Sequence, residues 1–241
     1  MAIPRIIHCC WFGGPKTPLA ERCLASWRRF APGWEIREWN LDDLRRRFAS
    51  PVFPPFVEAA IRRRAWAFAS DWARFRILAE EGGVYFDCDV ELVATIDDLA
   101  DSDWCATEIH PRAGAIAAPG SGIGLSRAHP VARRLAARYE AASAFVARPV
   151  SEWMEAEFPG LVAHSPDALG SVRLLPPDWF SPIDGSGALR MTAATRGIHH
   201  YAMSWAPLRL RIARWLCWHG LGPLASALVG FRRAVMGRGR A

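Results

Sequence analysis

The sequence predicts an α/β fold whose mainly parallel sheet is flanked by helices. Three observations support this prediction. Strand-like segments alternate with helical segments from residue 3 to residue 89, an order typical of parallel sheets. The stretch 84–86 is entirely apolar or aromatic, as in a strand that is covered on both faces. Carboxylates follow it directly, and ligands of such sheets bind at the carboxyl ends of the strands.

The first elements are two strands and the helices that follow them. The apolar stretch 3–11 predicts a strand that runs into a Gly-Gly turn, and a helix over 19–30 ends at a Pro-Gly pair. The stretch 34–40 alternates apolar and charged residues, which predicts a second strand with one exposed face. Asn40 can then cap a helix over 41–48, because its side chain can accept hydrogen bonds from the first turn.

A long helix leads into the apolar strand. The proline-rich stretch 50–56 predicts a crossing on the surface, and a helix over 61–81 follows it. The glycines at 82–83 act as its C-cap and precede the strand at 84–86. Downstream, the sequence predicts strands over 104–109 and 113–119, a helix over 129–142, and a strand within 171–180 that ends in a loop.

Composition indicates a folded globular protein. The chain has 241 residues, of which 51% are hydrophobic, enough to build a sizeable core. The N-terminal residues match neither a signal peptide nor a membrane anchor. The six cysteines include no C-x-x-C pair or metal-finger spacing, so they are expected to be reduced, mostly buried thiols. We therefore expect a cytoplasmic protein.

The positive charge is concentrated at the C-terminal end. The whole chain carries +6, residues 185–241 carry +9, and residues 1–184 therefore carry −3. Nucleic-acid binders usually spread basic charge over the recognition domain, so no nucleic-acid partner is expected. We divide the chain into a main folded domain over 1–206 and a basic, apolar helical tail over 207–241. The tail leaves two interpretations open: an amphipathic helix at an anionic membrane surface, or a helix packed on the domain.

A pair of carboxylates follows the apolar strand. Asp87 and Asp89 are one residue apart, and alternation along an extended chain would place both on one side. Such close like charges raise each other's pKa unless a cation lies between them, although a D-x-D can also merely cap a turn. An imidazole from the adjacent His199 and His200 could complete a cation site. This mixed oxygen and nitrogen set suits Mn²⁺ or Mg²⁺ better than Zn²⁺.

Two further charged residues lie on the preceding helix. Asp71 and Arg74 are three residues apart and share one face, which by itself indicates a surface ion pair. Because this helix leads straight into the strand before the D-x-D, they could instead lie near the two carboxylates.

Two other functions remain as alternatives. VYFDCDVEL also fits the signature of Mg²⁺-dependent phosphatases, in which Asp87 would be the nucleophile, but these enzymes need a later lysine. The single lysine of this sequence is Lys16, upstream of the motif. A non-catalytic, membrane-associated adaptor would have no use for Asp71, Arg74 and the D-x-D together.

Three stretches together resemble a known family. IPRIIHCCWFGG, ASDWARFRILAEEGGVYFDCDVEL and HHYAMSW resemble the glycosyltransferases whose sugar-binding region contains a D-x-D motif, over roughly residues 2–205. This group includes yeast initiating mannosyltransferases, bacterial capsule and polysaccharide transferases and, more distantly, clostridial glucosylating toxins. The most specific part is S-D-x-x-R followed by G-G-x-Y-x-D-x-D.

The resemblance implies a fold and a reaction. It implies a GT-A fold, a nucleotide-sugar donor such as a UDP-sugar or GDP-mannose, and a divalent metal, Mn²⁺ or Mg²⁺. It also implies transfer to a glycan or lipid-linked acceptor with retained anomeric configuration, in polysaccharide biosynthesis. The segment 141–172 matches the family pattern poorly, so the acceptor stays open.

The resemblance implies a catalytic set of four residues. Asp89 would bind the metal directly, and Asp87 would contact the ribose and the metal's water shell. Asp71 and Arg74 would hold the hydroxyls of the donor sugar.

Residues before and after this block would complete the site. His200 would be the C-terminal metal ligand, with His199 as its rival because the two are adjacent. His8 and Trp11 would bind the donor, and Trp11 would stack on its base. Trp205 would close over the diphosphate.

Overall fold

The computed structural model describes most of the domain predicted over 1–206. The described residues are 2–49, 52–110, 114–159, 172–183 and 188–202, together with Ile212, Ala213, Leu216, Leu221 and Leu224. The amphipathic helical tail over 207–241 therefore lies outside the described residues apart from these five positions, and so does Trp205. In the part of the chain that is described, no helix is both long and apolar enough to cross a membrane.

A central sheet of seven strands confirms the predicted fold class. Its order is β2-β1-β3-β7-β5-β6, with β8 also paired to β5. The strands β2, β1, β3, β5 and β8 run in one direction, and β7 and β6 run in the other. The strands are β1 (Ile6–Cys10), β2 (Glu35–Trp39), β3 (Gly83–Tyr85), β5 (Trp104–His110), β6 (Gly114–Ala117), β7 (Ile123–Leu125) and β8 (Arg173–Leu175).

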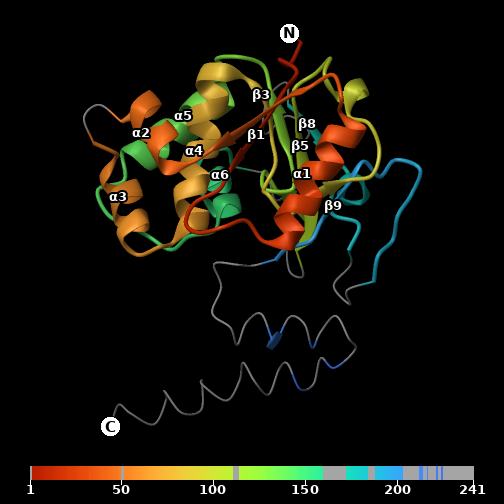
Figure 1. The fold of residues 1–241 in the computed structure, drawn as a ribbon. Coiled ribbons are helices and arrows are strands. Elements are labelled where there is room, and N and C mark those ends of the chain that lie inside the picture. Colours follow the sequence, from red (N-terminus) through yellow and green to blue (C-terminus); the bar gives the residue numbers. More distant parts are fainter. Residues whose placement is uncertain are drawn as a thin grey trace.

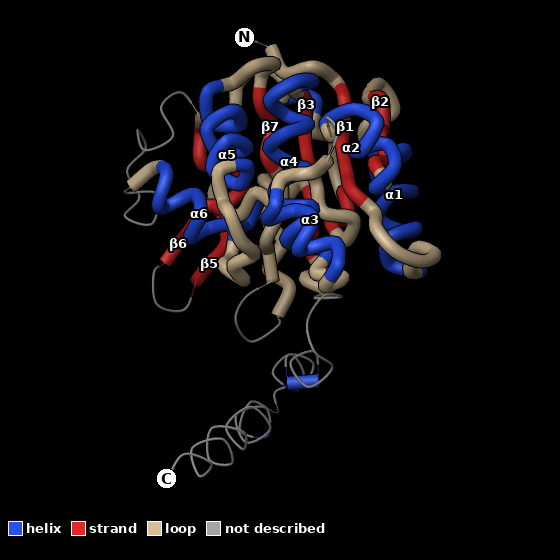
Figure 2. The backbone as a smooth tube through the Cα atoms, turned by 90° about the vertical axis from the view of Figure 1, so that its left-hand side faces the viewer, coloured by secondary structure: helices blue, strands red, loops and turns tan. Residues whose placement is uncertain are grey.

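Helices cover both faces of this sheet, as the predicted α/β class requires. Figure 1 shows α1 on one face and α2 to α6 on the other, and α4 lies across the middle of the larger layer in Figure 2. Each face has its own apolar cluster, one around Trp72 and Phe75 of α4 and one around Trp27 of α1. The helices are α1 (Pro18–Phe30), α2 (Leu41–Phe48), α3 (Pro55–Arg62), α4 (Trp66–Glu81), α5 (Pro130–Glu140) and α6 (Val150–Glu157).

The predicted helix over 61–81 is divided into α3 and α4. Arg64 has φ 53°, in the left-handed region, so the helix cannot continue through it. Part of the proline-rich stretch is helical, because Pro55 occupies the first position of α3, where a proline costs no hydrogen bond. The predicted start of α2 is confirmed: Asn40 accepts from the backbone N–H groups of Asp42 and Asp43 in a capping box.

A second, small sheet lies beside the D-x-D segment. It pairs β4 (Val90–Leu92) in antiparallel fashion with β9 (Gly197–His199), and neither strand was predicted. Each has three residues, too few for a periodic pattern to be visible in the sequence. This pairing carries the C-terminal histidines to the chain that leaves the D-x-D.

Candidate functional site

The D-x-D lies in a turn and not in the expected extended strand. β3 ends at Tyr85, and the backbone N–H of Val90 donates to the carbonyl of Asp87 at 3.0 Å. Tight turning of the chain, and not strand alternation, therefore brings the two carboxylates together. Their side chains are partly buried, with exposed fractions of 33% for Asp87 and 19% for Asp89. A ligand can still reach both.

His199 joins the two carboxylates. One oxygen of Asp87, one oxygen of Asp89 and one ring nitrogen of His199 all lie within 4.8 Å of one another. Among the described residues, this is the one group of three metal-ligating side chains that come so close. Two carboxylates and an imidazole fit a divalent cation such as Mn²⁺ or Mg²⁺.

His200 points elsewhere. Its Nε2 is 2.8 Å from Oε2 of Glu91, and it does not belong to the group around the D-x-D. Neighbouring side chains at the end of an extended strand project to opposite sides, so only one of two adjacent histidines can face the carboxylates. The geometry favours the rival residue, His199, over the ligand that the resemblance implied.

Asp89 and His199 form an ion pair. His199 Nε2 is 3.2 Å from Asp89 Oδ1, and the backbone N–H of Ala202 donates to Asp89 Oδ2 at 2.7 Å. Burial opposes ionisation of Asp89, but the charge and hydrogen bond of His199 and the N–H of Ala202 lower its pKa to about 2. Burial also disfavours charge on His199, yet Asp89 raises its pKa. A cation that binds here would therefore compete with a proton for His199.

Arg74 connects the helix α4 to the D-x-D. Its guanidinium is buried, with Nη1 3.1 Å from Asp71 Oδ1 and Nη2 2.9 Å from Asp87 Oδ1. It also lies over the ring of Tyr85, 4.7 Å from the centroid. The Asp71–Arg74 ion pair thus forms, but it is buried and not on the surface, and it lies beside the carboxylate of Asp87. Burial, and less strongly the charge of Asp87, raise the pKa of Asp71 to about 7 although Arg74 opposes this.

A glycine that was not predicted supports Asp87. Gly120 accepts a hydrogen bond from the backbone N–H of Asp87 at 3.0 Å. A Cβ at position 120 would clash with Oδ2 of Asp87, so only glycine leaves room for this carboxylate. The glycine-rich run 119–124 is the signal that could have suggested a close approach of the backbone.

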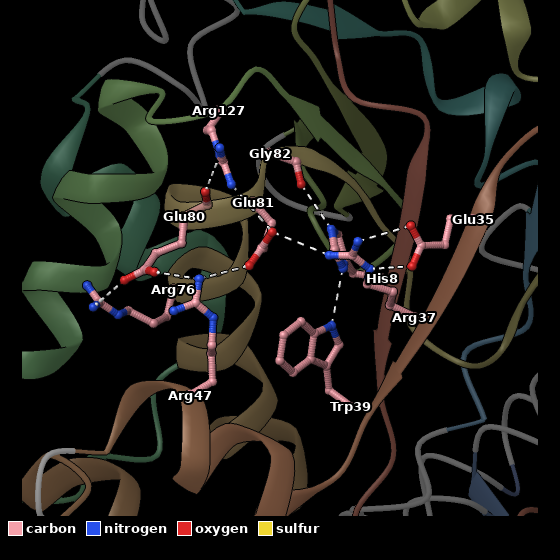
Figure 3. A network of polar contacts seen from close by, with 10 residues as sticks. All are labelled: His8, Glu35, Arg37, Trp39, Arg47, Arg76, Glu80, Glu81, Gly82 and Arg127. Carbon is pink, nitrogen blue, oxygen red and sulfur yellow. Dashed lines mark hydrogen bonds and ion pairs between the residues drawn. The ribbon is translucent and has the colours of Figure 1, made fainter.

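His8 lies in the core. Its Nε2 is 2.9 Å from the carbonyl oxygen of Gly82, and its Nδ1 is 3.1 Å from Nε1 of Trp39 (Figure 3). Both ring nitrogens are thus used within the protein, and the side chain is fully buried. Burial lowers the pKa of His8 to about 4. The structure therefore places His8, predicted to bind the donor, in the core with both ring nitrogens bonded within the protein.

Trp11 lies at the carboxyl end of β1. Its indole is partly buried, and Nε1 donates to the carbonyl of Gly14 at 2.9 Å. This location, on the same edge of the sheet as the D-x-D, agrees with the predicted contact with a base, which stays a prediction.

Comparisons with known proteins agree with the resemblance. Residues 19–105 match the family described as "Glycosyltransferase sugar-binding region containing DXD motif". The chain is 27% identical over 103 residues to an uncharacterised glycosyltransferase of Acanthamoeba polyphaga mimivirus, and this alignment covers 40% of the chain and 39% of that relative. The region 19–105 that matches the family includes Asp71, Arg74 and the D-x-D, and it ends before Gly120 and His199.

Two solved structures show a limited similarity to this chain. "PaToxG Glycosyltransferase" has a TM-score of 0.47 and 16% identity, over 66% of this chain and 70% of that one. A transferase mutant has a TM-score of 0.42 and 11% identity, over 69% and 88% of the two chains.

Proposed function

We propose that this chain, which carries the DXD sugar-binding region of a glycosyltransferase family, transfers a sugar from a nucleotide-sugar donor in a metal-dependent reaction. The observation that supports this most is the convergence of Asp87, Asp89 and His199 beside the buried Arg74. An anionic diphosphate would be repelled by two carboxylates unless a cation lay between them. A UDP-sugar or GDP-mannose would supply the diphosphate, and Mn²⁺ or Mg²⁺ would supply the cation.

The three side chains around the turn would hold the cation. Asp87, Asp89 and His199 offer oxygen and nitrogen ligand atoms within 4.8 Å of one another, and Nε2 of His199 faces Asp89. When bound, the cation would neutralise the charge that develops on the diphosphate leaving group as the glycosidic bond breaks. The short β4–β9 pairing keeps His199 in register with the chain beyond Asp89.

Asp71 and Arg74 would bind the donor sugar. The Arg74 guanidinium is fixed between two carboxylates, and its Nε is a buried donor without a hydrogen-bond partner. Buried donors normally have partners, and because this one is closed to solvent, a sugar hydroxyl oxygen would reach it only after the surrounding side chains move. The carboxyl of Asp71, next to it, could accept from or donate to a second hydroxyl.

The stereochemistry and the acceptor follow from the family resemblance. We propose retention of anomeric configuration, and assign no side chain as a nucleophile. A glycan or a lipid-linked glycan in polysaccharide biosynthesis is the proposed acceptor. A basic tail at the inner face of the membrane would suit a lipid-linked acceptor.

The contacts of Asp87 argue against the phosphatase alternative. That reaction needs Asp87 as a free nucleophile, but Arg74 holds its Oδ1 at 2.9 Å. It also needs a lysine at the phosphate. Lys16 instead pairs with Glu38, at 2.8 Å.

Acceptor-free hydrolysis of the donor tests the proposed function. The purified chain would be incubated with Mn²⁺ and a panel of nucleotide sugars, and release of nucleoside diphosphate would be measured. We expect turnover of one donor class, loss of turnover in excess EDTA, and a loss of at least ~100-fold in Asp89→Asn. Asp101→Asn, a change at an exposed carboxylate elsewhere, should behave as wild type. Full turnover in EDTA would refute the metal-dependent reaction.

A further inference from the structure

The turn that precedes β7 contacts two members of the candidate metal site. Gly120 lies against the carboxylate of Asp87, as described above, and the next residue, Ser121, places its Oγ 2.8 Å from Nδ1 of His199. Ser121 is fully buried. Both residues lie outside the stretch 19–105 that matches the glycosyltransferase family, so the family match assigns them no role.

Several contacts fix the imidazole of His199. Ser181 Oγ donates to Ser121 Oγ at 3.0 Å, so the hydroxyl that contacts the ring is itself held. The ring of Tyr201 stacks on the imidazole with centroids 3.9 Å apart. On the backbone, the N–H of His199 donates to the carbonyl of Phe180, the residue before Ser181. The ring can therefore rotate little.

The chemistry of a metal-bound imidazole suggests a role for the Ser121 hydroxyl. His199 Nε2 faces Asp89, so Nε2 is the nitrogen that a cation between the carboxylates would contact. A lone pair on Nε2 requires the ring proton to be on Nδ1, and that N–H needs an acceptor. The oxygen of Ser121 has two lone pairs, one for this N–H and one for the hydroxyl of Ser181.

We propose that Ser121, held by Ser181, is a positioning residue that orients His199 and keeps its Nε2 lone pair directed at the cation. The inference rests on the proposed function, because it needs a cation at Asp87, Asp89 and His199. Hydrogen bonds of this kind to metal-bound histidines typically contribute 10- to 100-fold to metal affinity. One turn would thus position two ligands, Asp87 through Gly120 and His199 through Ser121.

Isothermal titration of the full chain with Mn²⁺ alone tests the inference. We expect Ser121→Ala to weaken Mn²⁺ binding by roughly 10- to 100-fold and Ser181→Ala to weaken it less. The matched control is Ser126→Ala, which removes another buried hydroxyl, bonded to Asp103 away from the metal site. Ser126→Ala should bind Mn²⁺ as wild type does, whatever its effect on stability.

Nitrogen NMR of the imidazoles gives a readout that a merely structural role would not change. In the Mg²⁺-loaded protein we expect His199, identified by its absence in His199→Gln, to carry its proton on Nδ1. In folded Ser121→Ala, loaded with enough Mg²⁺ to compensate for weaker binding, this preference should be reduced. Unchanged Mn²⁺ affinity and tautomer in Ser121→Ala would overturn the inference.

The outcomes separate this inference from the proposed function. If wild-type protein binds no Mn²⁺, the proposed metal site fails and the inference fails with it. If Asp89→Asn abolishes binding while Ser121→Ala binds as wild type, the metal site stands and the inference alone is overturned. If Ser121→Ala does not fold, Ser181→Ala decides: weaker binding in the folded variant supports the inference, and wild-type binding overturns it.

Discussion

Charged residues gather at both ends of the strands of the central sheet. The group at the carboxyl ends (the carboxyl edge) is largely buried, whereas the group at the amino ends (the amino edge) is largely exposed. At the carboxyl edge, Asp71, Arg74, Asp87, Asp89 and His199 form a largely buried group, the carboxyl-edge cluster. At the amino edge, four arginines meet three glutamates in an amino-edge network, which Figure 3 shows around the end of α4. Its members are Glu35, Arg37, Arg47, Arg76, Glu80, Glu81 and Arg127.

The difference lies in solvent access and in how the charges balance. Arg47 and Arg127 of the amino-edge network have exposed fractions of 49% and 67%, and each carboxylate there has an arginine partner. In the carboxyl-edge cluster, three carboxylates share one arginine and one histidine, and the guanidinium of Arg74 is 2% exposed. Exposed pairs are screened by water and salt, whereas buried charges act strongly on their neighbours. The exposed network therefore adds little stability, and the buried cluster is suited to bind a charged ligand.

Removing the central guanidinium should produce the largest effect. Arg74→Ala leaves Asp71 and Asp87 without their buried partner, so we expect a loss of about 3–5 kcal/mol in the free energy of unfolding. Urea unfolding measures this loss, and donor turnover should fall by at least ~100-fold. Arg37→Ala is the matched control in the amino-edge network, and an equal loss there would erase the distinction between the two edges.

The buried histidine beneath the amino-edge network should make stability depend on pH. His8 is neutral in the folded protein because burial lowers its pKa to about 4, while the unfolded chain takes up a proton below the ordinary value of 6.5. Its contribution is fully present above pH 6.5 and is lost as the pH falls to about 4. At about 1.4 kcal/mol per pKa unit, the loss reaches roughly 3 kcal/mol.

Urea unfolding of wild type and His8→Gln between pH 4 and pH 7.5 checks this dependence. The variant starts from a lower stability because the contact with Trp39 is weakened, but its stability should fall less with acid. Parallel curves for the two proteins would show that His8 is not the responsible group. Donor turnover of the folded variant should change little, because His8 is buried and both its ring nitrogens are bonded within the core.

A smaller change at the carboxyl edge should affect metal binding. Gly120→Ala forces the carboxylate of Asp87 to move, so we expect roughly tenfold weaker Mn²⁺ binding in a titration. Gly14→Ala is the control, because a Cβ there meets no atom within 4 Å. Unchanged affinity in a folded Gly120→Ala would show that the position of Asp87 does not limit binding.

The exposed arginines should have the smallest effect. Arg47→Ala removes contacts of 3.3 Å to Glu80 and 3.1 Å to Glu81, and we expect a loss below about 1 kcal/mol. The difference from wild type should shrink further in 1 M NaCl, where the Debye length is about 3 Å. A larger, salt-independent loss in urea unfolding would place Arg47 among the buried, unscreened charges.

Local sequence signals predicted most of the elements and part of the site. Asn40 with Asp43 marked the start of α2, and the apolar stretch 84–86 marked the buried strand before the D-x-D. The left-handed turn at Arg64 was not predicted, because nothing in the residue type demands that conformation. β7 and α6 were also missed, since the first is only three residues long and the second lies in a stretch without a clear pattern.

The sequence by itself determined the chemistry that is available: the carboxylates of the D-x-D, Asp71 with Arg74, and a histidine pair far downstream. Their types and spacings are local properties, and the family match covers the first two. Only the tertiary structure places His199, and not His200, beside the two carboxylates, because this placement depends on the register of β9 against β4. It also decided that His8 is a core residue and that Gly120 and Ser121 lie at the site. These outcomes depend on contacts between distant segments, which no local pattern encodes.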